Sequence, residues 1–249
     1  MAEEHSDRPQ LRRSRDRSRE EDTFSVASYR TIPDVGADRR LWQRLIGAVS
    51  AMTASGAGAE EAYRSALEQL REYGGEAVDV IAATYEQLEE NAYQEQWALV
   101  QLLTDLALPE TTRFFGHLVQ TPVPEERSRD TVHGVSTVTE EVVLRTTAIE
   151  GLSRRIRDGD REAVDALLPA LEHEYVAMRR AAWHGLVDGG DEDGIARGRD
   201  ILSSRGDDWI IEIRRTPVVE IDQPRPEPGE ARPTAEPPNP FDEARPHGA

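Results

Sequence analysis

The sequence predicts an all-α protein, a short α-solenoid of antiparallel helical hairpins. Three observations lead to this prediction. Residues 140–205 contain an internal repeat, apolar residues recur at helical spacing from residue 38 onward, and glycines or prolines separate one helical pattern from the next. Together these observations predict nine helices in antiparallel pairs between Asp38 and Arg205.

The repeat consists of two units, each of which reads as a helix, a Gly-Asp turn and a second helix. The first helices align at a shift of 34 residues and the second helices at a shift of 31, so the first unit has three extra residues in its inter-helix loop. The glycine of each pair is expected to end one helix and the aspartate to cap the next. The residues that recur in the first helices are Arg145, Ala148, Gly151 and Leu152, which match Arg179, Ala182, Gly185 and Leu186.

A single hairpin of this kind cannot bury both of its faces, so neighbouring hairpins must stack on it, as they do in a solenoid. The second unit contains Arg179-Arg180-Ala181-Ala182-Trp183-His184-Gly185-Leu186 followed by Gly190-Asp191-Glu192-Asp193, and it resembles the HEAT-repeat family. HEAT units commonly have an Arg-x-x-Ala-x-x-x-Leu helix, a short Gly-Asp turn and a second helix. The resemblance covers residues 140–205 well and residues 38–121 loosely. It implies a HEAT-like fold and no particular activity.

Two residues of the repeat depart from the family pattern. Pro169 falls within the second helix of the first unit, where it should bend the helix. Gly198 stands in the second unit at a position where an apolar residue is expected.

Five further helices are predicted between Asp38 and Thr121, before the repeat. Each has apolar residues along one face at spacings of three and four. A Gly-Ala linker follows the first helix, Gly74-Gly75 ends the second, and prolines follow the fourth and the fifth. The stripes include Leu41, Leu45 and Val49, then Tyr63, Leu67 and Leu70, then Val78, Ile81 and Tyr85, then Val100, Leu103 and Leu106, and finally Phe114, Phe115 and Leu118.

Residues 121–139 form an insertion between the fifth helix and the repeat. Its β-branched residues around Gly134 predict an extended loop or a small hairpin. Long loops in compact domains are often functional, but a solenoid also tolerates spacers at little cost, so both interpretations stay open.

Residues 208–221 are predicted to be extended, with Trp209–Ile213 and Val218–Ile221 as their apolar parts. We expect this segment to cap the open face of the last hairpin. Alternatively, it offers a strand to a partner by edge addition.

Both ends of the chain are predicted to be disordered tails. Residues 222–249 contain eight prolines. Residues 1–37 are polar, and the six arginines between residues 8 and 19 form a cluster that can contact RNA or acidic surfaces. Nearby acids dilute this cluster, so a solvated tail is expected. A possible foothold on the folded body consists of Phe24, Val26, Tyr29 and Ile32.

Composition excludes several classes of protein. The net charge is -18, and residues 38–221 carry -14 of it, which disfavours general nucleic-acid binding by the core. All 30 basic residues are arginine. The absence of cysteine excludes disulfides, thiol catalysis and Cys-ligated metals. No apolar run reaches the 18 residues of a membrane span, so we expect a cytoplasmic protein without membrane contact.

The sequence predicts no catalytic, cofactor-binding or metal-binding residue. Six histidines occur, none at a spacing typical of zinc sites or of nucleophile and base pairs. The acids of Asp191–Asp193 do not fit a calcium loop, because its first and last ligand positions hold Gly189 and Asp200. The Gly-Ala stretch at residues 56–59 follows a helix and lacks a lysine, so it is interpreted as a linker.

The leading hypothesis for function is a non-enzymatic HEAT-like scaffold or adaptor that binds a protein partner with a basic surface. One alternative is a HEAT-like enzyme or enzyme subunit similar to the bilin lyases, and another is a dedicated acidic inhibitor or immunity-type partner of a basic protein. The two repeat arginines have a second possible role, in which they bridge acidic groups of adjacent repeats. The candidate contact residues are Arg145, Arg179, Arg180, Trp183, His184 and Trp209.

Overall fold

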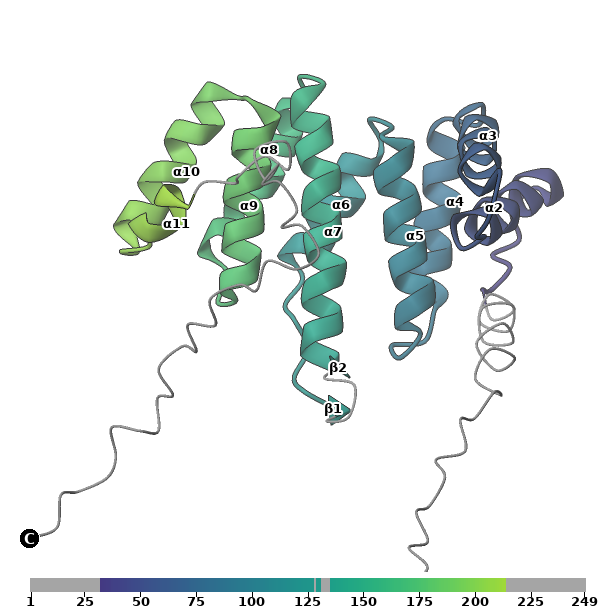
Figure 1. Cartoon of the computed structure of the whole chain (residues 1–249), viewed down its shortest axis with the longest axis horizontal. Coiled ribbons are helices and arrows are strands. Elements are labelled where there is room, and N and C mark those ends of the chain that lie inside the picture. The colour runs from purple at the N-terminus through teal and green to yellow at the C-terminus, as the bar shows by residue number, and fades with distance from the viewer. Residues whose placement is uncertain (1–31, 128, 131–134, 214–249) are drawn as a thin grey trace, which may run out of the picture. The chain divides into compact units, whose positions relative to one another are not determined.

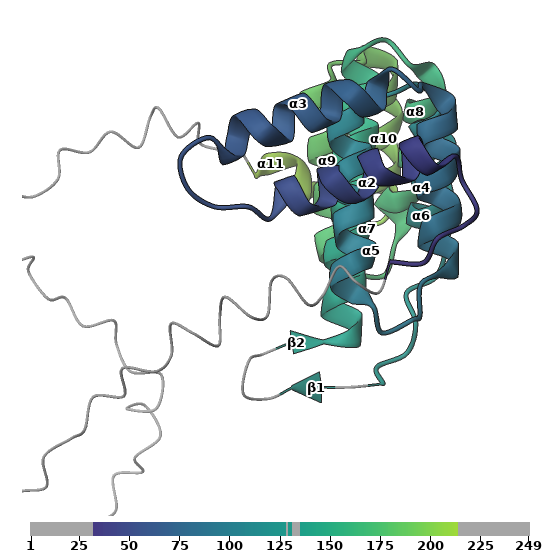
Figure 2. The same ribbon diagram turned by 90° about the vertical axis from the view of Figure 1, so that its right-hand side faces the viewer.

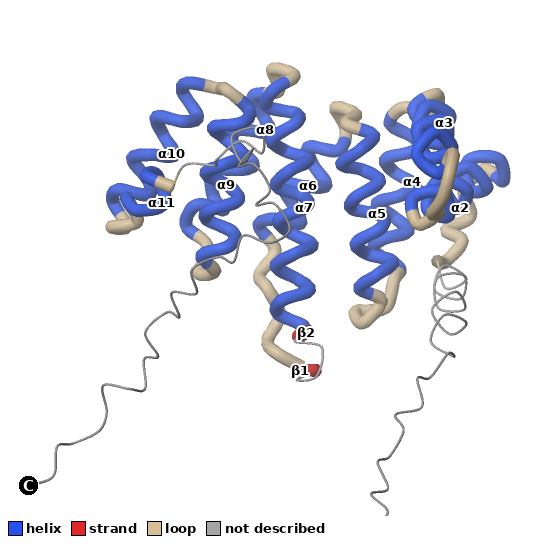
Figure 3. Tube along the Cα trace, in the orientation of Figure 1, coloured by secondary structure: helices blue, strands red, loops and turns tan. Residues whose placement is uncertain are grey.

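The structure is a computed structural model that describes residues 32–127, 129–130 and 135–213. Its described part is helical apart from two short strands, which confirms the predicted all-α class (Figure 3). Between Asp38 and Arg205 the described residues form nine α-helices, the predicted number. These are α2 (Arg39–Met52), α3 (Ala59–Arg71), α4 (Gly75–Gln87), α5 (Tyr93–Leu106), α6 (Thr111–Gln120), α7 (Thr137–Arg157), α8 (Arg161–Leu167), α9 (Val176–Gly189) and α10 (Glu192–Ser204).

In the compact unit that ends at Glu212, each helix packs on helices that are close to it in the chain, often on the next helix but one. Helix α7 packs extensively against α5 on one side and α9 on the other, and Figure 1 shows the three as adjacent columns. Helix α6 packs against both α7 and α8. Helices α2 and α3 pack on each other and run across the direction of α4 to α7 (Figure 2).

Helix α2 shows how a capping residue and an apolar pattern in the sequence produce a helix with one buried face. The Asp38 carboxylate accepts hydrogen bonds from the backbone N–H groups of Arg40 and Leu41, at 2.9 and 3.2 Å, and so starts the helix. Leu41, Leu45 and Val49 recur on one face and are fully buried. Ile32, one of the four residues predicted as a possible foothold on the folded body, is only 7% exposed and belongs to the core, whereas the other three lie outside the described residues.

The two Gly-Asp turns of the repeat have the predicted roles. Gly159 and Gly190 have left-handed backbone φ angles of 87° and 79°, which a glycine adopts without steric cost. Asp160 caps α8 by accepting from the backbone N–H of Glu162 at 3.0 Å. Asp191 caps α10 by accepting from the backbone N–H of Gly194 at 2.7 Å.

Pro169 shortens the second helix of the first unit. Helix α8 ends at Leu167, and a 3₁₀ helix, η2 (Leu168–Glu172), follows with the proline in its first turn. This placement avoids a proline in the interior of an α-helix, where it lacks an N–H to donate. At the place where a bend was predicted, the chain therefore changes from an α-helix to a 3₁₀ helix.

The insertion contains a small hairpin, one of the two predicted structures. Strand β1 (Arg129–Asp130) pairs antiparallel with β2 (Val135–Ser136). Helix α7 then begins at Thr137, within the range predicted as insertion. Ser136 caps it by accepting from the backbone N–H of Thr139 at 3.2 Å.

The segment after α10 corrects the prediction of an extended cap. Residues Asp208–Glu212 form a short helix, α11, which packs on α9 and α10. β-Branched Ile210 and Ile211 favour extended structure locally, but the helix buries Ile210 completely, and this tertiary packing overrides the local preference. The rest of the predicted cap, residues 214–221, and the tails at residues 1–31 and 222–249 lie outside the described residues.

Candidate functional site

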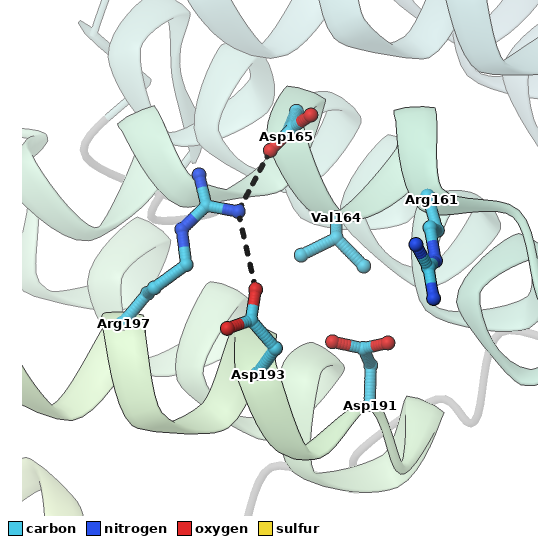
Figure 4. Close-up of a pocket in the computed structure, with 6 residues that line it drawn as sticks. All are labelled: Arg161, Val164, Asp165, Asp191, Asp193 and Arg197. Carbon is cyan, nitrogen blue, oxygen red and sulfur yellow. Dashed lines mark ion pairs between the residues drawn. The ribbon is translucent and has the colours of Figure 1, made fainter.

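One charged recess lies between α8 and the start of α10 and has a volume of about 280 Å³ (Figure 4). The Arg197 Nη1 atom lies 2.9 Å from Asp165 Oδ1 and 3.7 Å from Asp193 Oδ2. Asp191 also faces this space, but its carboxylate caps α10. The ion pair of Arg197 with Asp165 therefore joins one unit of the repeat to the next.

A larger recess of about 620 Å³ has a different charge balance, and we call it the acidic recess. The loop between α4 and α5, the insertion and the first turns of α7 build it. It is lined by Glu89, Glu90, Asn91, Tyr93, Arg127, Thr137, Glu140 and Glu141.

Two of the four glutamates in the acidic recess are paired with arginines. Glu141 forms an ion pair with the buried Arg145, and Glu90 forms one with Arg127. Glu89 and Glu140 form no ion pair among the described residues. The recess thus carries more negative charge than its own cations neutralise.

The environment of Glu140 reflects this surplus of negative charge. Partial burial raises the pKa of Glu140, and the nearby carboxylates of Glu141 and Glu126 raise it further. Glu126 reaches this region because its Oε1 accepts a hydrogen bond of 3.0 Å from the backbone N–H of Thr137. A cation that enters the recess would relieve this repulsion.

Tyr93 adds an aromatic ring to the acidic recess. Burial, together with the charges of Glu140 and Glu141, raises the pKa of Tyr93 to about 12, so its hydroxyl stays protonated at neutral pH. Guanidinium groups bind carboxylates through a planar fork and also stack on aromatic rings. The recess therefore combines the two surfaces that an arginine side chain recognises.

A third recess, of about 560 Å³, adjoins the acidic recess, because Glu89 and Asn91 line both. Pro33, near the beginning of the described chain, also lines this third recess. The chain thus enters the fold beside the acidic recess.

Three of the six predicted contact residues act inside the fold, which corrects the prediction for them. Arg145 is 2% exposed, and its guanidinium donates to the carbonyls of Thr121 and Pro122, both at 3.1 Å. Arg179 is also buried and donates to two carbonyls at 2.8 Å, those of His173 and Glu174. Both arginines bind carbonyl groups that directly follow the helix preceding their own, α6 for Arg145 and η2 for Arg179.

These arginines were also predicted to bridge acidic groups of adjacent repeats. Their carboxylate partners show that this second prediction is wrong as well. Glu141, the partner of Arg145, lies on the same helix. Arg179 Nε lies 3.0 Å from Asp207 Oδ2, in an ion pair that lacks hydrogen-bond alignment, and Asp207 follows α10 of the same unit. Within the described ranges, neither arginine forms an ion pair with an acidic group of an adjacent repeat.

Trp183 is the third buried contact candidate. It is 4% exposed, and its ring packs under α10 near Gly198. The remaining candidates lie on two helices. Arg180 is exposed and His184 is half-buried on α9, while Trp209 is 44% exposed on α11 and donates its Nε1–H to Asp207 at 3.3 Å.

The sequence analysis missed the acidic recess. Its two glutamates without ion pairs are 51 residues apart, in a chain with 48 acidic residues, so no local signal singles them out. The only local signal is that each glutamate has a glutamate next to it near the start of a helix. Glu89-Glu90 lies just before α5, and Glu140-Glu141 lies near the start of α7.

In the ranges that the structure describes, no group of three or more histidine, aspartate or glutamate side chains is placed to hold a metal ion. None of the helices described combines the length and apolar character that crossing a bilayer requires. No protein-family model, curated protein or solved structure matches this chain. The acidic recess is the candidate site, and its chemistry suits the binding of an organic cation.

Proposed function

We propose that this chain is a non-enzymatic, HEAT-like α-solenoid scaffold of the cytoplasm that binds a basic segment of a protein partner in the acidic recess. The observation that carries the proposal is that Glu89 and Glu140, which form no ion pair among the described residues, lie beside the ring of Tyr93. Two carboxylates near one aromatic ring favour arginine, because its guanidinium is planar and always charged.

Equivalent residues of the two units support the HEAT-like part of the proposal. Gly159 and Gly190 both end helices in the left-handed conformation. Asp160 and Asp191 both cap the helix that follows. The repeat arginines both bind carbonyl groups that directly follow the preceding helix. A shared sequence pattern with shared local roles is expected of stacked repeats.

The charge of the chain supports a protein partner over a nucleic acid. The net charge of -18 repels phosphate backbones at long range. The same field attracts a basic polypeptide and speeds its encounter with the recess. Because the carboxylates of the recess are partly exposed, the attraction should weaken as salt shortens the screening length.

A short arginine-rich peptide is a suitable probe for the recess. The double variant Glu89→Gln and Glu140→Gln removes two negative charges there. We expect it to weaken peptide binding by about tenfold, since each exposed ion pair contributes up to about 1 kcal/mol. Isothermal titration calorimetry at low salt measures the dissociation constants.

The matched control is the double variant Asp165→Asn and Asp193→Asn in the recess of Figure 4. It changes the net charge by the same amount at a different place. We expect binding within about twofold of the parent, because only the long-range attraction is reduced. Equal losses in both variants would show that the peptide responds to net charge and not to the acidic recess, and would overturn the proposed site.

A further inference from the structure

On the basis of the proposed function, we infer that the chain carries its own competitor for the acidic recess. The competitor is the arginine-rich segment of residues 8–19, and its occupancy of the recess regulates access by the partner. This segment lies outside the described residues, so the inference rests on where the described chain begins, on how far the segment reaches and on complementary charge.

The described chain begins beside the recess. Ile32 is buried in the hydrophobic core, which fixes this point of the chain to the fold. The next residue, Pro33, lines the adjoining recess together with Glu89 and Asn91. Both of these residues also line the acidic recess. The segment is therefore tethered at the edge of the site that it is inferred to occupy.

The tether is long enough. Twelve residues separate Arg19 from Ile32, and such a linker spans up to about 40 Å when extended. A short tether holds a ligand near its site at an effective concentration in the range of about 1 mM. Weak contacts that would not hold a separate peptide can therefore fill the recess from within the same chain.

The charges of the segment and the recess are opposite. Residues 8–19 contain six arginines and one acidic residue, a net charge of +5. The recess offers Glu89 and Glu140, which have no ion-pair partner in the part of the chain that the structure describes. Arg127 already binds Glu90 at this site, so a guanidinium group of this chain is accommodated there. The arginines of the segment would extend this contact to the remaining carboxylates.

A spin label on the full-length chain tests the inference. The chain has no cysteine, so Gln10→Cys creates a single attachment site for a nitroxide within the segment. At low salt we expect selective broadening of the amide NMR signals of Glu89, Tyr93 and Glu140. Signals from the recess of Figure 4, such as that of Asp165, should stay sharp. The Glu89→Gln and Glu140→Gln variant should lose the broadening, whereas the Asp165→Asn and Asp193→Asn variant should retain it.

A second label controls for chance encounters. Gln223→Cys places the nitroxide in the other terminal region, which carries more acidic residues than arginines. We expect no selective broadening of the acidic recess from this position. If the label at residue 10 leaves the recess unaffected, or if both labels broaden it equally, the inference is wrong whether or not the arginine-rich peptide binds.

Competition is tested by replacing the six arginines of residues 8–19 with glutamine in the full chain. If the segment fills the recess in about nine molecules in ten, its removal should tighten binding of the arginine-rich peptide about tenfold. Equal affinity for both chains would overturn the regulatory role. If the label broadens the recess while neither chain binds the peptide, the proposed function fails and the internal contact stands.

Discussion

At the scale of single residues, buried arginines in this protein serve the backbone. Arg145 and Arg179 each donate to two carbonyl groups of a neighbouring segment. Arg155 does the same for Ala107, with its Nη1 at 3.2 Å from the carbonyl. A buried carbonyl without a donor is costly, so these guanidinium groups satisfy the segments that join helices. These same arginines also pair with carboxylates, so one guanidinium group serves both the backbone and an acidic side chain.

The acidic recess gives a pH prediction for Glu140. Because its pKa is raised in the folded state, the folded chain binds this proton more readily than the unfolded chain does. Its contribution to stability therefore grows as pH falls toward the ordinary glutamate pKa and is lost as pH rises through the raised value.

Glu140→Gln removes this dependence on pH. We expect the variant to be more stable than the parent at pH 7.5 by about 0.5 kcal/mol or less, the scale of exposed substitutions. The difference should shrink as pH falls to about 4, near the ordinary glutamate pKa. Urea unfolding of both chains at the two pH values measures it. A difference that grows on acidification contradicts the assignment.

At the scale of elements, the close approach of α10 to α9 and η2 depends on a missing side chain. A Cβ atom at Gly198 would lie 2.7 Å from Leu186 Cδ1 and 3.1 Å from Leu171 Cδ1. The glycine that departs from the family pattern thus lets α10 pack directly on α9 and η2. Without it, Trp183 would lose part of its cover.

Gly198→Ala should therefore destabilise the protein by about 1–3 kcal/mol, the usual cost of overpacking. Gly47→Ala in α2 is the matched control, because a Cβ at Gly47 would meet no atom within 4 Å. In that helix alanine should stabilise by about 0.5–1 kcal/mol through its higher helix propensity. Opposite signs in urea unfolding are the expected result, and a stabilising Gly198→Ala would show that α10 moves away at little cost.

The helices and their turns could be predicted because their signals are local. The spacing of Leu41, Leu45 and Val49 is enough to define α2. Contacts between residues far apart in the chain could not be predicted from the sequence. The helical form of α11 depends on a buried contact of Ile210, and the acidic recess depends on Glu89 and Glu140 meeting across a long stretch of chain. Trp183 was assigned to the surface because its cover comes from a glycine of another helix.

At the scale of the whole molecule, net charge opposes compactness. The chain has 48 acidic residues and 30 arginines. Ion pairs between helices offset part of the repulsion, for example Arg154 with Asp105 at 2.9 Å across α7 and α5. The remaining charge is spread over one compact unit and its terminal regions, so its repulsion is reduced when ions screen it.

Salt should therefore stabilise the fold while it weakens binding in the acidic recess. Raising NaCl from about 0.01 to 0.15 M shortens the screening length from about 30 to 8 Å. A gain of about 1 kcal/mol would raise Tm by about 2–4 °C for a chain of this size. Thermal unfolding followed by circular dichroism measures the shift. A fall in Tm would mean that ion pairs such as Arg154 with Asp105 outweigh the repulsion.

Helix α11 has a consequence for association between copies of the chain. Each unit of a stacked repeat presents to the next a face like the one it received, so the last unit has an end on which another copy could add. Here α11 lies on α9 and α10 and buries Ile210. Ile210→Asp should loosen this cover, and sedimentation velocity at rising concentration would then show larger species, whereas unchanged sedimentation would show that the end is inert. We therefore predict that this helix of five residues prevents further copies of the chain from adding to that end.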